Sequence, residues 1–180
     1  MAGIPTIVFG FFALTFVTPV LRTIIPALDS FNSVSPGIVV GIMIVPVITS
    51  MSADAMASVP NKIREGAYGL GSTKFEVATK VVLPAAASGV VASIVLGISR
   101  AIGETMIVSL AAGSSPTASL NLTNSIQTMT GYIVEVATGD ATFGSDMYYS
   151  IYAVGFTLFI FTLIMNLISY WISKRFREEY

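Results

Sequence analysis

The chain has 180 residues, of which 54% are hydrophobic and 11% are charged, and its mean hydropathy is +0.81. Because a soluble domain carries roughly a quarter charged residues, this composition indicates a membrane protein. The formal net charge of −1, with no basic stripe among aromatic residues, excludes a nucleic-acid-binding protein. Cysteine and histidine are absent, which excludes disulfides, thiol nucleophiles, imidazole bases and the usual metal sites.

Four apolar segments are long enough to cross a bilayer, which needs roughly 20 mainly apolar residues for each helical span. These segments are 4–22, 35–53, 84–112 and 150–172. We therefore expect an all-α fold, a polytopic transmembrane helical bundle in which residues 1–180 form a single transmembrane domain. The first segment has no basic residue before Arg22, so it lacks the charged start of a signal peptide.

Lysine and arginine mark the cytoplasmic side of membrane proteins. Most of the nine basic residues fall in the connection 54–83 or in the C-terminal tail: Lys62, Arg64, Lys74, Lys80, Lys174, Arg175 and Arg177. The connection 113–149 contains none. The distribution predicts that both termini and the loop 54–83 are cytoplasmic, and that 113–149 is extracytoplasmic.

The predicted extracytoplasmic segment contains apolar residues close to a helical period, at Ile126, Met129, Ile133 and Val136. This pattern favours a short amphipathic helix at the outer surface. A loop with scattered apolar residues remains the alternative.

The predicted cytoplasmic loop begins with a helical pattern. Pro60 suits a first helical position, and residues 61–68 can form two turns. Gly69 and Gly71 then predict the end of this helix and a glycine turn.

A second helix is predicted after the glycine turn. Thr73 and Glu76 have the spacing of a capping box, so this helix begins there and continues towards Leu83. We expect Pro84 to open the third span.

The glycines of this loop resemble a phosphate-binding loop only superficially. Gly66 and Gly71 have the right spacing, but Ser72 stands where that motif needs lysine, and no strand precedes it. The chain therefore shows no ATPase motif of its own.

The same loop resembles the "EAA" loop of ABC importer permeases, whose pattern is E-A-A-x3-G-x9-I-x-L-P. The positions that correspond are Glu65, Gly66, Ala67, Gly71, Val81, Leu83 and Pro84. Only Gly66 for alanine and Val81 for isoleucine depart from the pattern. In that family the loop forms the helices that dock on the ATPase subunit, so the resemblance implies a coupling loop at 54–83.

Further stretches, at 2–14, 64–84, 99–113, 125–134 and 163–180, resemble permeases of the phosphate-specific transport system. The segments "RAIGETM" and "QTMT" are closer to its C-type (PstC) permease than to its A-type. The resemblance implies a non-enzymatic permease subunit of an ATP-driven importer of inorganic phosphate, multi-pass in the cell membrane. It implies three partners: a second permease, an ATPase dimer that binds the ATP, and an extracytoplasmic phosphate-binding protein. No cofactor is expected on this chain.

Members of that family have more spans than this chain, and the opening "MAGIP" resembles an internal segment of the family. We therefore expect the two N-terminal spans of the family and their loop to be missing.

Arg100 and Glu104 lie within the third apolar segment, where a charge costs about 2.5–3.5 kcal/mol. On an unbroken helix they are one turn apart and can pair. A planar guanidinium also binds phosphate with parallel hydrogen bonds, so Glu104 could hold Arg100 until phosphate arrives. The resemblance implies that both residues are important for transport. A structural ion pair that fixes helix packing is the alternative.

Two other functions remain open from the sequence. The substrate could be another oxyanion or small solute, because the loop motif does not discriminate among them. The chain could also be a membrane scaffold that reports transporter state to a sensor kinase, which a deletion of the tail would test. An intramembrane hydrolase is disfavoured, because no Ser/His or paired-Asp arrangement is present.

Overall fold

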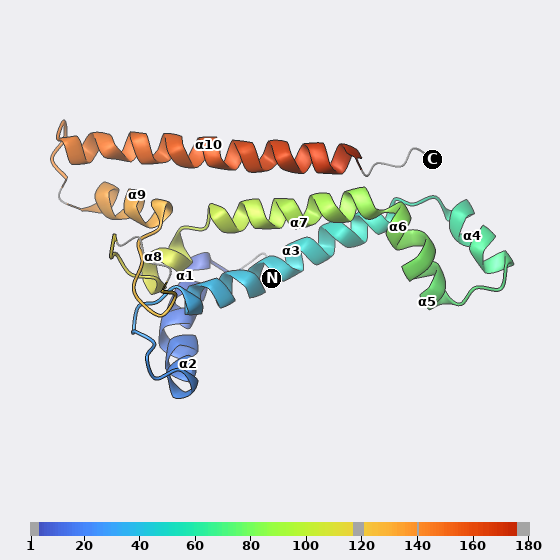
Figure 1. Cartoon of the computed structure of the whole chain (residues 1–180), viewed down its shortest axis with the longest axis horizontal. Coiled ribbons are helices and arrows are strands. Elements are labelled where there is room, and N and C mark those ends of the chain that lie inside the picture. Colours follow the sequence, from blue (N-terminus) through green and yellow to red (C-terminus); the bar gives the residue numbers. More distant parts are fainter. Residues whose placement is uncertain (1–3, 117–120, 140, 176–180) are drawn as a thin grey trace. The chain divides into compact units, whose positions relative to one another are not determined.

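The computed structural model describes residues 4–116, 121–139 and 141–175, and all regular secondary structure in these ranges is helical (Figure 1). This confirms the all-α expectation. Arg177 of the basic tail lies outside the described residues. The elements are α1 (Thr6–Phe12), η1 (Ala13–Val17), α2 (Thr18–Ile24), α3 (Val34–Ala57), α4 (Asn61–Gly69), α5 (Lys74–Glu76), η2 (Val77–Val82), α6 (Leu83–Ala85), α7 (Ala87–Ile102), α8 (Met106–Ala111), α9 (Met129–Thr138) and α10 (Asp146–Arg175).

Three helical stretches within the described ranges are long and apolar enough to cross a membrane: Thr6–Ile24, Val34–Ala57 and Asp146–Trp171. They correspond to the first, second and fourth apolar segments of the sequence. The third differs. It passes the same test only as a bent pair, Lys74–Ala85 and Ala87–Ile102, whose axes differ by 73°.

The bend corrects the expectation that Pro84 opens the third span. The helix that begins at Lys74 instead continues through Pro84 to Ala85, and the chain turns at Ala86 before α7 begins. Proline has no N–H to bond the carbonyl of Lys80, and its ring crowds that carbonyl. The missing hydrogen bond weakens the helix at Pro84. The chain therefore changes direction directly after this proline.

A second break corrects the expectation of a continuous helix over 84–112. α7 ends at Ile102, and α8 begins at Met106. Gly103 lies at this break, where its lack of a side chain makes a helix less favourable. The carbonyl of Glu104 instead accepts a hydrogen bond of 2.9 Å from the Thr130 hydroxyl, which satisfies it outside a helix.

Two widened, π-helical turns interrupt the helices, and each ends two residues before a proline. η1 precedes Pro19, and η2 precedes Pro84. A wider turn moves the carbonyl away from the proline ring, so the helix can continue past the proline. In η1 the Thr18 hydroxyl bonds the carbonyl of Ala13 at 3.0 Å and satisfies it.

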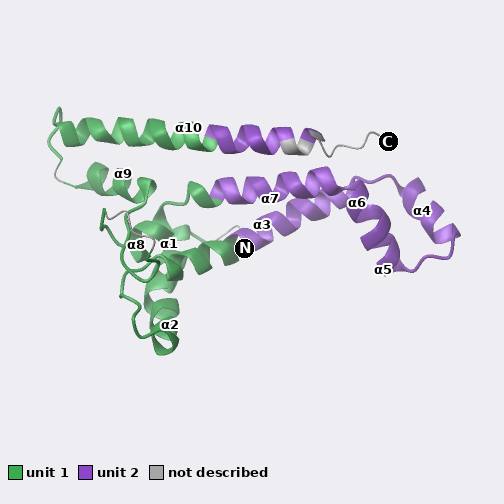
Figure 2. Ribbon diagram, in the orientation of Figure 1, with its two compact units in different colours: residues 1–43, 101–162 green, residues 44–100, 163–180 purple. Residues whose placement is uncertain are grey.

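The chain divides into two compact units (Figure 2): residues 1–43 with 101–162, and residues 44–100 with 163–180. In unit 1, α1 packs closely on α8. A Cβ added at Gly10 would lie 2.9 Å from a methyl carbon of Leu110 and 3.0 Å from the carbonyl of Met106. Only glycine permits this approach, and Ile107 on α8 is fully buried.

Unit 1 also contains the segment that connects α8 to α9. The backbone N–H of Ser33 and its hydroxyl both donate to the carbonyl of Leu122. The N–H of Ile126 bonds the carbonyl of Ala112 at 3.0 Å. The amphipathic helix expected from Ile126, Met129, Ile133 and Val136 is present as α9, which begins at Met129 and so leaves Ile126 outside it. Val136 is buried, and the loop alternative is wrong for residues 129–138.

In unit 2, α3 and α7 lie side by side and approach closely (Figure 1). A Cβ at Gly89 would be 2.6 Å from the Cβ of Ala55, and the hydroxyls of Ser52 and Ser93 are 2.6 Å apart. Beyond this crossing, the helices that follow α3 form a small core of their own, made of Val59, Val77, Val82 and Ala86.

Candidate functional site

Residues 61–85 of unit 2 form two antiparallel helical arms, which we call the helical hairpin. Pro60 caps α4 rather than beginning it, and α4 ends at Gly69, as the glycines predict. The turn that follows is closed by the Gly71 N–H, which bonds the carbonyl of Tyr68 at 2.9 Å. Gly71 has φ +82°, a left-handed conformation that strongly favours glycine.

The second arm begins with the predicted capping box. The Thr73 side chain accepts from the backbone N–H of Glu76, and the Glu76 carboxylate accepts from the N–H of Thr73 at 3.1 Å. The Thr73 hydroxyl also donates to the Glu76 carboxylate at 2.9 Å, and the hydrogen bonds to this carboxylate, first from the backbone of Thr73 and then from its hydroxyl, lower the pKa of Glu76 below its ordinary value of 4.5. Lys80 adds an ion pair at 3.2 Å and lowers that pKa further.

The two arms are held together by apolar contacts. Val77 and Val82 of the second arm are buried beside Val59, and Ile63 and Ala67 of α4 pack against them. Ala67 of the loop motif therefore faces inward. Its small side chain keeps α4 close to η2.

The opposite surface of the hairpin is open. Glu65 and Gly66 are exposed, and a Cβ built at Gly66 or Gly71 meets no atom within 4 Å. Two large apolar side chains at the tip are also solvent-exposed, Leu70 by 88% and Phe75 by 76%. Exposed apolar side chains beside open glycine backbone form a surface suited to close approach by another protein.

The remaining motif positions lie where the hairpin meets α7. Val81 is half-buried, Leu83 is 42% exposed, and Pro84 precedes the bend at Ala86. The motif thus covers both arms, the turn and the bend.

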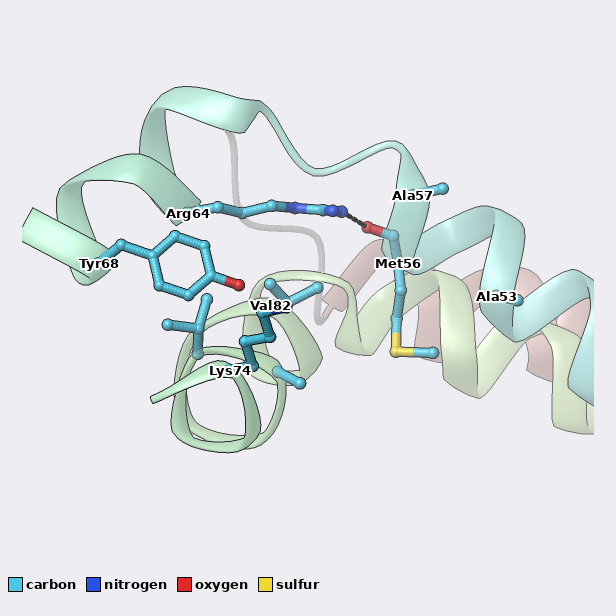
Figure 3. A pocket seen from close by; sticks show the side chains of 9 residues that line it. Ala53, Met56, Ala57, Arg64, Tyr68, Lys74 and Val82 are labelled. Carbon is cyan, nitrogen blue, oxygen red and sulfur yellow. Dashed lines mark hydrogen bonds between the residues drawn. The ribbon is translucent and has the colours of Figure 1, made fainter. Parts of the chain in front are cut away.

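Arg64 is a feature that sequence reasoning did not single out. Its Nη2 donates to the carbonyl of Met56 at 2.6 Å, so α4 is tied to the last turn of α3 (Figure 3). Arg64 also lines a pocket of about 320 Å³ together with Tyr68, Lys74 and Val82. The sequence showed only a basic residue in a basic loop. The contact depends on how α3 and α4 pack.

The second candidate pair, Arg100 and Glu104, is not arranged as the sequence predicts. α7 ends at Ile102, so the two residues do not share a helical face, and the expected one-turn spacing is wrong. Arg100 belongs to unit 2 and is exposed, and within the described part of that unit no hydrogen bond or ion pair involves its guanidinium.

Glu104 lies in unit 1 and is buried, with 8% exposure. Its neighbourhood is polar: the Thr130 hydroxyl bonds its carbonyl, and the Thr128 and Thr130 hydroxyls are 3.2 Å apart. The Ser109 hydroxyl is buried without a hydrogen-bond partner among the described residues. The segment "QTMT" contains both threonines, but nothing in its sequence pattern predicts that Thr130 contacts Glu104.

No group of three or more acidic, histidine or cysteine residues that could hold a metal occurs among the described residues.

Comparison with known proteins relates the chain to a family of membrane transport components. A family model described as "Binding-protein-dependent transport system inner membrane component" matches residues 1–178. The chain is 33% identical over 175 residues to the "Probable ABC transporter permease protein YqgH" of Bacillus subtilis, which covers 97% of this chain and 56% of the relative.

Two other relatives carry more specific names. The "Probable phosphate transport system permease protein PstC" of Methanocaldococcus jannaschii is 31% identical, over 99% of this chain and 61% of the relative. The "Phosphate transport system permease protein PstC" of Xylella fastidiosa is 33% identical, over 94% of this chain and 57% of the relative. The chain thus spans between 56% and 61% of the length of these three relatives. No solved structure matches it.

Proposed function

We propose that this chain, which belongs to the family of binding-protein-dependent transport system inner membrane components, is a permease subunit of an ATP-driven ABC importer of inorganic phosphate. The family match covers almost the whole chain, and the apolar helices fit a multi-pass membrane protein. This match is the observation that carries the proposal. The name of the substrate comes from the relatives, two of which are phosphate permeases by name.

The chain itself catalyses no reaction in this proposal and holds no cofactor. A separate ATPase dimer binds and hydrolyses ATP, a second permease completes the pathway, and an extracytoplasmic binding protein delivers phosphate. The distribution of lysine and arginine supports a cytoplasmic position for both termini and for the loop 54–83. The segment 113–149 then faces the binding protein.

The helical hairpin is the element that contacts the ATPase. Its tip offers Leu70 and Phe75 as apolar anchors, and Gly66 leaves room for close approach. Arg64 ties this docking element to α3 through the carbonyl of Met56, and the second arm of the hairpin joins α7 through the bend at Ala86. A movement of the hairpin would therefore reach two membrane helices at once.

Arg100 and Glu104 are our candidates for the substrate pathway. The break after Ile102 removes the one-turn ion pair on which the structural alternative rested, because that pair needs an unbroken helix. An exposed guanidinium without a partner in its own unit is available to an anion. Glu104 is buried, and its backbone carbonyl accepts a hydrogen bond from the Thr130 hydroxyl.

Disrupting the gene in its own host tests the function. We expect high-affinity uptake of radiolabelled phosphate to fall and to return with the wild-type gene, while excess sulfate or molybdate leaves the restored uptake unchanged. Loss of sulfate or molybdate uptake instead would reassign the substrate. Normal uptake of phosphate with altered expression of phosphate-controlled genes would favour the signalling scaffold.

A further inference from the structure

The pocket between the end of α3 and the helical hairpin has a composition that the proposed function does not use. Three of its lining residues, Arg64, Tyr68 and Lys74, are polar, and none of the lining residues is acidic. The rest are alanine, valine or methionine side chains of α3 and η2. The pocket therefore combines two positive charges and a phenol with an apolar wall (Figure 3).

Arg64 is incompletely satisfied. Nη2 donates to the carbonyl of Met56, but Nε is buried and has no hydrogen-bond partner among the described residues. A buried donor of a charged group is costly when it is left unpaired, so an acceptor from outside the chain would relieve it. An anionic oxygen is the acceptor that a guanidinium binds best, and Lys74 on the same pocket adds a second cation.

We propose that this pocket binds the phosphate group of an anionic phospholipid. A headgroup phosphate would lie between Arg64 and Lys74, within reach of Tyr68. The first carbons of the lipid would cover the apolar wall made by Met56 and Val82.

Two observations favour a lipid over free inorganic phosphate, which shares the same chemistry. Much of the lining is apolar, which suits an amphiphile better than a small hydrated ion. The pocket also begins at the last turn of α3, a helix apolar enough to cross a membrane, where headgroups lie. Basic residues next to the cytoplasmic end of a span commonly attract anionic lipids.

The consequence is mechanical. A lipid bound here would contact α3, α4 and the second arm of the hairpin together, and it would add to the Arg64–Met56 tie. The proposal rests on the proposed orientation, in which the hairpin lies at the cytoplasmic end of α3, and it stands whether or not phosphate is the transported substrate.

The chain contains no cysteine, so one introduced thiol can report on the pocket. Ala78 lines it one helical turn after Lys74, and Ala78→Cys would be alkylated with uncharged N-ethylmaleimide. The full chain would be reconstituted in phosphatidylcholine vesicles with or without phosphatidylglycerol. We expect phosphatidylglycerol to slow alkylation by roughly fivefold, the effect of about one basic residue at an anionic surface. Adding inorganic phosphate to pure phosphatidylcholine vesicles should leave the rate unchanged.

Matched variants separate this site from general surface charge. Lys74→Ala and Arg64→Gln, each in the Ala78→Cys background, should abolish the protection, whereas Lys62→Ala, on an exposed residue outside the pocket, should preserve it. Lys74 makes no contact in the core of the hairpin, so Lys74→Ala should not disturb folding. It therefore still tests the proposal if Arg64→Gln fails to fold. Protection that survives Lys74→Ala, or equal protection of Leu70→Cys at the exposed tip, would overturn the proposal. Protection by inorganic phosphate alone would overturn the assignment to a lipid.

Discussion

Arg100 is the residue whose side-chain chemistry can distinguish a substrate-binding role from a structural role. It is exposed and lies near the end of α7, and the helix that was expected to join it to Glu104 ends at Ile102. A lysine would keep the positive charge but not the planar, two-pronged geometry that fits a phosphate. The two roles therefore predict different outcomes for the same substitution.

We predict that Arg100→Lys reduces phosphate uptake nearly as much as Arg100→Ala. Uptake would be measured in a host that lacks other phosphate importers, with protein levels checked by immunoblotting. The double variant Arg100→Leu/Glu104→Leu removes both charges, and its insertion is checked in the same way. If that variant inserts normally and still transports phosphate, neither residue belongs to the pathway.

Thr73 is a residue whose role was predicted fully from the sequence. We predict that Thr73→Ala weakens the second arm of the hairpin by about 1 kcal/mol, the usual cost of losing such a cap. Amide hydrogen exchange of residues 74–85 should become faster by a factor of about five. Exchange in α4 serves as the internal reference. Unchanged exchange in 74–85 would show that the cap contributes nothing.

Glu76 makes the same cap dependent on pH. Its pKa in the folded chain is lowered below the ordinary value of 4.5, mainly by hydrogen bonds from Thr73. A lowered carboxyl pKa stabilises the fold at pH above 4.5, and this contribution is lost as the pH falls through the folded-state value. Protection of 74–85, corrected for intrinsic exchange, should therefore decrease on acidification in the wild type. Glu76→Gln should lack this dependence.

At the scale of elements, the close crossing of α3 and α7 decides the packing of unit 2. Gly89 has no space for a side chain, because its Cβ would lie 2.6 Å from that of Ala55. A Cβ built at Gly41, on α3, would have no atom within 4 Å. Both glycines lie in helices, so the same substitution at each compares a crowded position with an open one.

We predict opposite effects of alanine at these two positions. Gly89→Ala should overpack the crossing and destabilise the protein by about 1–3 kcal/mol. Gly41→Ala should stabilise its helix by up to about 1 kcal/mol, since alanine is the better helix former. The midpoint temperature of unfolding in detergent would measure both. Equal shifts in the two variants would contradict the tight α3–α7 packing.

The elements also show which local features a sequence can predict. The glycine turn at Gly71 and the cap at Thr73 were predictable, because each depends on residues a few positions apart. The π turns were not. Pro19 and Pro84 each follow one, whereas Pro46 lies inside α3 without one, so proline alone does not specify a widened turn.

Tertiary hydrogen bonds were equally beyond prediction. The Thr130–Glu104 contact joins residues 26 positions apart, and the Arg64–Met56 contact depends on the packing of α4 against α3. The sequence identified Glu104 and Arg64 only as charges. What each touches follows from the fold.

At the scale of the whole molecule, hydropathy predicted three of the membrane helices well, because apolar length alone determines them. Hydropathy predicted one continuous helix for the third segment. The helix breaks at Ala86 and Gly103, but these small residues do not interrupt an apolar run in the sequence. The orientation stays a prediction from charge alone. Lysine and arginine residues are concentrated in the loop 54–83 and in the C-terminal tail, and they are absent from 113–149.

We predict that Asn121→Cys reacts with a membrane-impermeant thiol reagent in intact cells. Lys62→Cys, in the exposed part of α4, should react only after the membrane is opened. The absence of native cysteine removes background labelling. Reversed labelling would invert the orientation, and the hairpin could then not contact a cytoplasmic ATPase.

The central claim is that the hairpin couples ATP hydrolysis to phosphate import, and vesicles holding the chain with its partner subunits test it most directly. Phosphate accumulation and ATP hydrolysis would be measured in the same preparation for the wild type and for Gly71→Glu. A bulky charge at the turn, where Gly71 has φ +82°, should disturb the docking surface. We predict ATP-dependent accumulation in the wild type and a parallel loss of both activities in the variant. Undiminished accumulation and hydrolysis in a correctly inserted Gly71→Glu protein would contradict the account.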